Sequence, residues 1–408
     1  MGRAVRPPAI WMILIAAFLD MMAMGIVMPV LPGLIEKLTG SLASAGVWTG
    51  VIGSLWALMQ FVCAPAIGSL SDRFGRRPVI LISTAGLMLD WVMMALAPSL
   101  WWLVVGRVIG GITSASATAL FAYMADVTAP EERAKAFGLI GAAISAGFVL
   151  GPAIGGILGE IAPRLPFWVA AGFSGAAFLY GLVVLSESLP RERRMPFTWR
   201  TANPVGALRM VAGRRELKAL ASCVFLLTFS HRLFMTVFVL FAGHRHGLTT
   251  LQVGVLLAFS SVLDLIVQGL LVGPATARFG NRRTIVAGLL GGAVSLLAMG
   301  MVPGALLFVV AMVPASLMGL AEPTLKSVLS RRVPESEQGR LQGAMQSLTS
   351  VAGISGPVFF GWVYALSSGS LPGLSFLIAA AILAMAAILA IAESQAATAS
   401  WAQDRLET

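Results

Sequence analysis

Residues 68–77 decide the fold, and they read Gly68-Ser69-Leu70-Ser71-Asp72-Arg73-Phe74-Gly75-Arg76-Arg77. Gly68 permits a close approach between helices, and Gly75 permits a tight turn. Asp72 can pair with the arginines, which can also hold the carbonyl groups at a helix C-terminus. We therefore predict a charged latch between the two halves of the chain. It is called here the Asp72 loop and is formed by Gly68, Asp72, Arg73, Gly75, Arg76 and Arg77.

The Asp72 loop returns 205 positions later, with Arg278-Phe279-Gly280 in place of Arg73-Phe74-Gly75. The offset recurs twice: Glu132, Lys135 and Gly138 match Glu337, Arg340 and Gly343, and Gly151-Pro152 matches Gly356-Pro357. Three matches at one offset predict an internal duplication. In the second loop (residues 273–283, the Ala277 loop) alanine replaces the acid, so we expect the stronger latch in the first half.

Composition identifies the class of protein. The 408 residues are 58% hydrophobic and only 11% charged, with a mean hydropathy of +0.88. Soluble domains carry about 25% charged residues. An integral membrane protein is therefore predicted, and the same composition excludes a disulfide scaffold. The two cysteines, Cys63 and Cys223, lie in apolar runs and are expected to be buried apolar residues.

A bilayer needs about 20 apolar residues per helix. On that measure we predict an all-α protein of twelve spans, near residues 9–34, 46–70, 79–98, 100–124, 135–160, 166–186, 217–243, 251–275, 284–302, 304–328, 341–366 and 372–393. The longest polar break is 187–216. We expect two pseudo-symmetric six-helix bundles, 1–186 and 217–408, joined by a cytoplasmic linker over 187–216, as in rocker-type transporters.

The basic residues set the orientation. With both termini inside, cytoplasmic segments hold 22 of the 28 Lys and Arg residues, the opposite side holds three, and three lie within spans. The net charge of +10 is therefore an orientation signal and indicates no nucleic-acid partner.

Charges within spans are expensive and usually functional. Asp90 and Arg107 fall at equal depth on neighbouring spans, and so do Arg232 and Asp264, so we expect each to be an ion pair. Glu322 and Lys326 are four residues apart and share one helix face. For each pair, a merely structural salt bridge is as reasonable an interpretation as a functional one.

Asp20 differs because no basic residue lies at its depth in the first half. A buried carboxyl without a basic partner is suited to load and unload a proton. The uncharged polar residues Gln60, Gln268 and His231 are weaker candidates for substrate contacts, because packing between helices explains them equally well. No metal site, catalytic residue or nucleotide-binding loop is expected.

The fifth span carries small residues every four positions around a proline, a pattern that lets two helices touch closely. This set comprises Gly147, Gly151, Pro152, Gly155 and Gly156. It resembles the motif of drug/proton antiporters, and the Asp72 loop resembles the signature gating loop of the major facilitator superfamily. That resemblance implies that spans 1, 4, 7 and 10 line a central cavity, which places charged residues from all four spans in it.

Residues 57–168 most closely resemble bacterial tetracycline/proton antiporters, and weaker similarity extends over nearly the whole chain. The matching stretches are Ala57-Leu58-Met59-Gln60, Leu89-Asp90-Trp91, Gly106-Arg107 and Gly110-Gly111-Ile112-Thr113. The resemblance implies that Asp20, Asp90 and Arg107 serve substrate and proton exchange. The second half departs from that family, because Asp264 stands where the family has a histidine and Gly292 where it has an acid.

The expected function is proton-coupled export of amphipathic drugs, tetracycline-like or multidrug, by alternating access. Proton coupling is assigned to Asp20, Asp90, Arg107, Asp264 and Glu322, and the cavity to Gln60, His231, Arg232, Gln268 and Lys326. We expect no cofactor, a substrate that can arrive as a metal chelate, and a monomer in the bacterial cytoplasmic membrane. The alternative is a symporter or exporter of an endogenous metabolite. An intramembrane hydrolase built on Ser355 is disfavoured because no histidine follows that serine.

Overall fold

The computed structural model describes residues 7–114, 117–194, 213–334 and 337–404. All regular structure in those ranges is helical. The chain divides into two compact units. The first contains the described residues up to Ala202 together with Leu248–Phe259, and the second contains the remainder. The sequence-derived boundaries at 186 and 217 stay a prediction.

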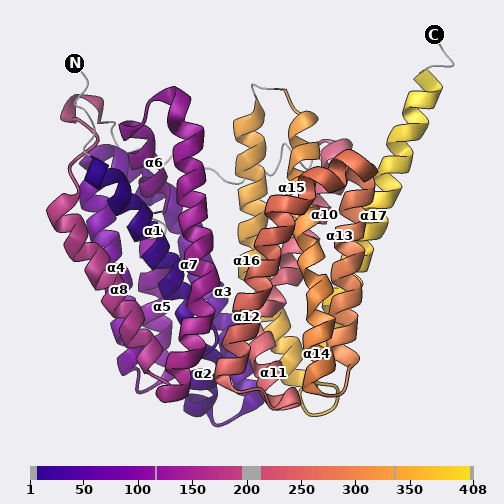
Figure 1. Ribbon diagram of the computed structural model, residues 1–408, viewed down its shortest axis with the longest axis horizontal. Coiled ribbons are helices and arrows are strands. Elements are labelled where there is room, and N and C mark those ends of the chain that lie inside the picture. The colour runs from indigo at the N-terminus through magenta and orange to yellow at the C-terminus, as the bar shows by residue number, and fades with distance from the viewer. Residues whose placement is uncertain (1–6, 115–116, 195–212, 335–336, 405–408) are drawn as a thin grey trace. The chain divides into compact units, whose positions relative to one another are not determined.

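The first unit is built around α1, which packs against α7 and α8, while α4 packs against α5 and α8 (Figure 1). Its buried core includes Met12, Ile13, Tyr123 and Ile140. The helices of this unit are α1 (Pro7–Val27), α2 (Leu31–Thr39), α3 (Leu42–Phe74), α4 (Arg76–Leu96), α5 (Leu100–Ser114), α6 (Ala117–Val127), η1 (Pro130–Glu132), α7 (Arg133–Ile161), α8 (Leu165–Val184) and η2 (Arg191–Arg193).

In the second unit α13 packs against α15 and α17, and α10 packs against α16 and α17 (Figure 1). A π-helical segment, η4, interrupts the run from α12 to α13. The helices here are α10 (Arg215–Thr236), α11 (Phe238–His246), α12 (Thr250–Ile266, whose first residues group with the other unit), η4 (Val267–Leu271), α13 (Val272–Met301), α14 (Ala305–Met312), η5 (Val313–Leu317), α15 (Met318–Arg331), α16 (Gln338–Ser367) and α17 (Leu374–Asp404).

The internal repeat is visible in the backbone. Gly75 ends α3 with φ +107°, and Gly280, 205 residues later, interrupts α13 with φ +78°. A residue with a β-carbon rarely adopts either conformation. Likewise Pro152 lies inside α7 and Pro357 inside α16. The duplicated glycines therefore make the same break at corresponding places.

Eleven stretches among the described residues are long and apolar enough to cross a membrane. One of them, Thr250–Met301, has 52 residues. It would be about 78 Å long as a helix at 1.5 Å per residue, against about 30 Å for the bilayer core. Because Gly280 breaks this stretch, it supplies two crossings, and the count of twelve spans follows. The protein is a multi-pass membrane protein.

Three predicted spans are less regular than expected. The first, 9–34, ends as α1 at Val27, and a separate helix α2 starts at Leu31, because Pro29 and Pro32 cannot donate within a continuing helix. The seventh breaks between α10 and α11 at Val237. The tenth is interrupted by a 3-10 helical segment at Val313–Leu317, which contains Pro314.

Candidate functional site

The Asp90–Arg107 ion pair expected from depth is present. The Arg107 Nη2 atom lies 2.6 Å from the Asp90 Oδ2 atom, and the Asp90 side chain is completely buried. The Arg107 guanidinium carbon also lies 4.5 Å from the centre of the Trp91 ring. The pair thus joins α4 to α5 with both charges removed from solvent.

Glycines make room for this pair. A β-carbon added at Gly110 would lie 2.7 Å from Asp90 Cγ, and one added at Gly106 would lie 2.9 Å from Asp90 Oδ1. Both distances are shorter than side chains tolerate. This arrangement explains the residues at these positions of α5. Arg107 supplies the counter-charge to Asp90, and Gly106 and Gly110 leave room for the Asp90 carboxylate.

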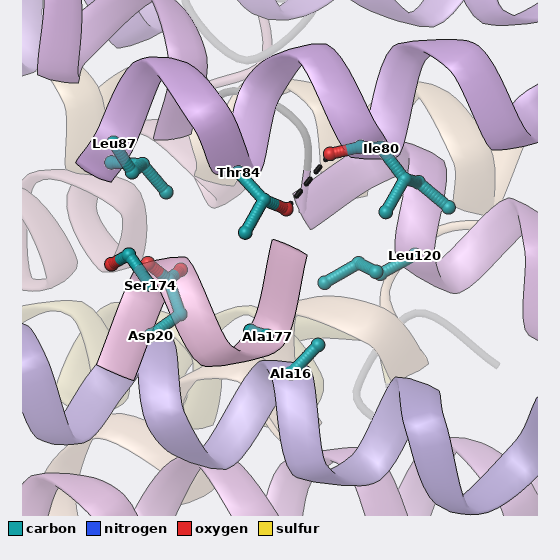
Figure 2. Close-up of a pocket in the computed structure, with 8 residues that line it drawn as sticks. All are labelled: Ala16, Asp20, Ile80, Thr84, Leu87, Leu120, Ser174 and Ala177. Carbon is teal, nitrogen blue, oxygen red and sulfur yellow. Dashed lines mark hydrogen bonds between the residues drawn. The ribbon is translucent and has the colours of Figure 1, made fainter. Parts of the chain in front are cut away.

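Asp20 lies on a small cavity inside the first unit. The cavity has a volume of about 20 Å³ and is lined by residues of α1, α4, α6 and α8. Figure 2 shows Asp20, Thr84 and Ser174 turned into this space. Within the described part of the chain Asp20 forms no ion pair, as expected for it from the sequence. Sequence reasoning placed it on a helix of the central cavity and did not anticipate this smaller one.

The predicted Arg232–Asp264 pair is wrong: among the described residues neither side chain forms an ion pair. The stem of Arg232 packs on α16, where a β-carbon added at Gly356 would lie 2.8 Å from Arg232 Cβ. Arg232 instead lies within the electrostatic influence of Glu322. Equal depth does not fix which face of a helix a side chain occupies, and residue counting could not show that difference.

Glu322 and Lys326 do share one face of α15, with 2.7 Å between Nζ and Oε1. Their side chains are 46% and 43% exposed although they lie within the Ala305–Arg331 span. Charges this exposed at membrane depth are tolerated where they face water rather than lipid. We therefore expect this face of the second unit to be accessible to water.

The Asp72 loop is held by a charge network centred on Arg76. The Arg76 Nη1 atom lies 2.6 Å from Asp72 Oδ1, and its Nε atom lies 3.2 Å from Asp126 Oδ2 on α6. Its backbone N–H, at the exposed start of α4, donates to Glu187 Oε1 over 2.8 Å. Glu187 also faces Arg194 at 3.8 Å. The network fastens the loop to the end of α6 and to the start of the linker.

The remaining members of the loop are placed as follows. Arg77 donates to the Leu182 carbonyl of α8 over 3.0 Å, while Arg73 is exposed and lies over the Phe74 ring. Gly68 is partly buried within α3, with open space where a β-carbon would be. At Gly75, an added β-carbon would lie 2.6 Å from Glu187 Cδ, so this glycine admits the acid that caps α4.

The Ala277 loop lacks the network. Arg278 lies over Phe279, as Arg73 lies over Phe74, but in the described part of the chain Arg278, Arg282 and Arg283 form no ion pair. The position that corresponds to Asp126 is occupied by Arg331, which carries the same charge as the arginines of the Ala277 loop and cannot pair with them. Among the described residues, the charge network is thus confined to the first copy of the loop. The latch between the two halves stays a prediction.

The small-residue motif of the fifth span forms a close contact between α7 and α1. A β-carbon added at Gly151 would lie 2.7 Å from Gly25 Cα, and Gly147 and Gly155 also face the α1 backbone. Gly156 faces Thr250 and Leu251 at the start of α12. Pro152 supplies its Cδ atom to the contact with Gly25. The motif thus lets three helix segments meet backbone to backbone.

Comparison with known proteins agrees with this geometry. The family model described as Major Facilitator Superfamily matches residues 13–270 and 220–400. The chain belongs to the Major Facilitator Superfamily. It is 38% identical to "Tetracycline resistance protein, class C" of Escherichia coli, over 92% of this chain and 94% of that protein. It is 28% identical to "Multidrug resistance protein 2" of Bacillus subtilis (strain 168), over 86% and 87%.

Solved structures show the same superfamily fold. The nucleoside transporter NupG matches with a TM-score of 0.76 at 15% identity, covering 94% of this chain and 98% of that chain. A bacterial homolog to the human lysosomal transporter Spinster matches with a TM-score of 0.77 at 18% identity, covering 96% and 98%. At these identities the likeness concerns the fold alone.

The three uncharged candidates for substrate contacts are Gln60, His231 and Gln268. The Gln60 side chain donates to the Ser114 hydroxyl over 3.4 Å, a bond between α3 and α5. The His231 ring lies 5.5 Å from the Phe234 ring, and Gln268 is exposed in the π segment. These positions agree with helix packing for Gln60 and leave Gln268 accessible.

His246, the last residue of α11, was not among the candidates taken from the sequence. Its ring stacks on Phe308 with 4.4 Å between centroids, and meets Phe241 edge-on at 5.4 Å. Burial, and secondly the charge of Arg245, lower the pKa of the His246 imidazole. Asp126 and Glu187 were also missed, because no local pattern ties either of them to the Asp72 loop.

Proposed function

We propose that this chain is a proton-driven exporter of amphipathic drugs, with tetracyclines as the first candidates. The observation that carries the proposal is the 38% identity to "Tetracycline resistance protein, class C" over 92% of the chain. The match to "Multidrug resistance protein 2" supports export of a wider set of drugs. The geometry supports proton coupling, since acidic side chains lie within membrane-spanning helices of both units.

In this proposal the two units alternate in giving access to each side of the membrane, and protons that enter from outside compete with substrate for acidic groups. Asp20 exchanges the proton, while the Asp90–Arg107 pair holds α4 and α5 together and responds to that exchange. The proton gradient supplies the energy, and a metal ion takes part only as a component of a chelated substrate. The acids of the second unit, Asp264 and Glu322, take the place of the family's histidine and acid.

A second candidate function is transport of an endogenous metabolite. The exposed Glu322–Lys326 pair favours it, because a water-facing ion pair can recognise a small charged or zwitterionic molecule. The two functions differ in direction if the metabolite is taken up with protons. They differ in substrate preference if it is exported.

Proteoliposomes that contain the purified protein distinguish these functions. An imposed proton gradient should drive tetracycline opposite to the proton flow, and a panel of amphipathic drugs should define the range. Movement of substrate with the proton flow would contradict export. A charged metabolite that outcompetes every drug would favour the second function.

We further propose that the protein is a monomer of the bacterial cytoplasmic membrane with both termini in the cytoplasm. The excess of basic residues in the segments assigned to that side supports the orientation. Fluorescent and periplasm-dependent reporters fused to the C-terminus test it, because each is active on one side only. Activity of the periplasm-dependent reporter would reverse the assignment.

A further inference from the structure

The Asp20 cavity is too small for a drug and large enough for water. Its volume is about 20 Å³. A single water molecule needs about 10–15 Å³ of such space. The wall consists of Ala16, Asp20, Ile80, Thr84, Leu87, Leu120, Ser174 and Ala177. The cavity can therefore hold one water next to a carboxyl group, and it excludes an amphipathic substrate.

The polar groups in the wall can each make a further hydrogen bond. Ser174 is 4% exposed, and its hydroxyl makes no hydrogen bond within the described part of the chain. The Thr84 hydroxyl donates its proton to the Ile80 carbonyl over 2.8 Å and so can only accept another hydrogen bond (Figure 2). Buried polar groups in proteins are satisfied by protein or by ordered water. Asp20, Thr84 and Ser174 together offer a water the two to four partners that it needs.

We propose that one water molecule occupies this cavity, bridges Asp20 to Thr84 and Ser174, and relays the proton that Asp20 exchanges. In the loading step a proton passes from the hydronium form of this water to a carboxylate oxygen of Asp20, which leaves a neutral water and a neutral carboxyl group. Unloading is the reverse. The role of the relay in transport rests on the proposed function, but the water site does not.

The other acidic residues on the helices that line the cavity are engaged in ion pairs. Asp90 on α4 is paired with Arg107, and Asp126 on α6 is paired with Arg76. The described side chains of α8 include no ionisable group other than Tyr180. Asp20 is the one ionisable side chain among the residues that line the cavity. A proton that arrives there has one strong acceptor, which makes Thr84 and Ser174 positioning residues for it.

The test is infrared spectroscopy of purified protein without substrate, titrated with acid. The carboxyl C=O band of Asp20 is identified by its loss in Asp20→Asn. In Ser174→Ala and Thr84→Val this band should move to higher frequency, because the carboxyl loses hydrogen bonding through the water. The matched control is Ser83→Ala, which removes a buried hydroxyl from α4 away from the cavity and should leave the band in place.

Transport provides the second measurement. A hydrogen bond to a charged group is worth about tenfold or more in an equilibrium, so Ser174→Ala should slow proton-driven export about tenfold. Substrate counterflow, which moves no net protons, should stay within twofold of the parent, and this also shows that the variant folds. A band that ignores both substitutions overturns the relay. If the band responds but the parent exports nothing against a gradient, the water site stands and the exporter proposal is wrong.

Discussion

The buried Asp90–Arg107 pair should show an asymmetry when its partners are removed one at a time. Removing one member of a buried pair costs about 3–5 kcal/mol of stability, because the other charge is left unpaired. In Asp90→Asn the stranded group is a guanidinium, which cannot lose its proton in a protein. We therefore expect that variant to lose the full amount at every pH from 5 to 8.

Arg107→Met strands a carboxylate instead, and a carboxylate can be neutralised. An ordinary aspartate has a pKa of about 3.9, and each pH unit away from the pKa corresponds to about 1.4 kcal/mol. Holding the lone carboxyl neutral at pH 7 therefore costs at most about 4 kcal/mol, and the cost falls to about 1.5 kcal/mol at pH 5. The folded variant binds one more proton than its unfolded chain, so its stability should rise as the pH falls.

The assay is unfolding of the two single variants and the double variant in mild detergent at pH 5, 6 and 7, followed by tryptophan fluorescence. The double variant, which has no charge at this place, should be more stable than Asp90→Asn at each pH. Equal pH dependence of the two single variants would refute this account. So would a double variant that is no better than Asp90→Asn.

Three further changes test other contacts. Glu187→Gln weakens a charged hydrogen bond to the Arg76 N–H by about 1 kcal/mol. It should therefore slow export several-fold while the affinity for substrate in detergent stays unchanged. A parallel loss of affinity would contradict a role of Glu187 in the Asp72 loop. Gly151→Ala places a β-carbon 2.7 Å from the α1 backbone and should lower the thermal midpoint, whereas Gly141→Ala, on the same helix with open space around it, should not. Burial lowers the pKa of His246, so below about pH 6.5 the unfolded chain binds more protons than the folded protein. The parent should therefore lose stability as the pH falls from 7 to 5. His246→Phe should remove part of that loss. Identical pH profiles would show that His246 does not contribute.

The large-scale organisation was predictable because it depends on periodic and additive signals. Apolar runs indicate spans one at a time, and the 205-residue offset indicates a duplication without any knowledge of packing. The positive φ of Gly75 and of Gly280 confirms that the repeat exists in the backbone. The Asp90–Arg107 pair was predictable because adjacent helices joined by a short loop must lie side by side.

The features that were missed depend on rotation about helix axes and on contacts between distant segments. Arg232 and Asp264 share a depth, but their helices present them to different neighbours. Glu187 reaches the Asp72 loop from 111 positions along the chain. The hydroxyl group of Ser174 is ordinary in sequence, because serines in apolar spans most often bond to their own helix. Only the structure shows that it lines the same cavity as Asp20.

The most direct test of the central claim compares the parent with Asp20→Asn in proteoliposomes that can carry a substrate gradient, a proton gradient or both. Asparagine keeps the size and hydrogen bonding of the side chain and removes its titration. We predict that the variant still equilibrates substrate down its own gradient but no longer moves it uphill when a proton gradient is imposed. Undiminished uphill transport by Asp20→Asn would contradict the account and would move the coupling site to Asp264 or Glu322.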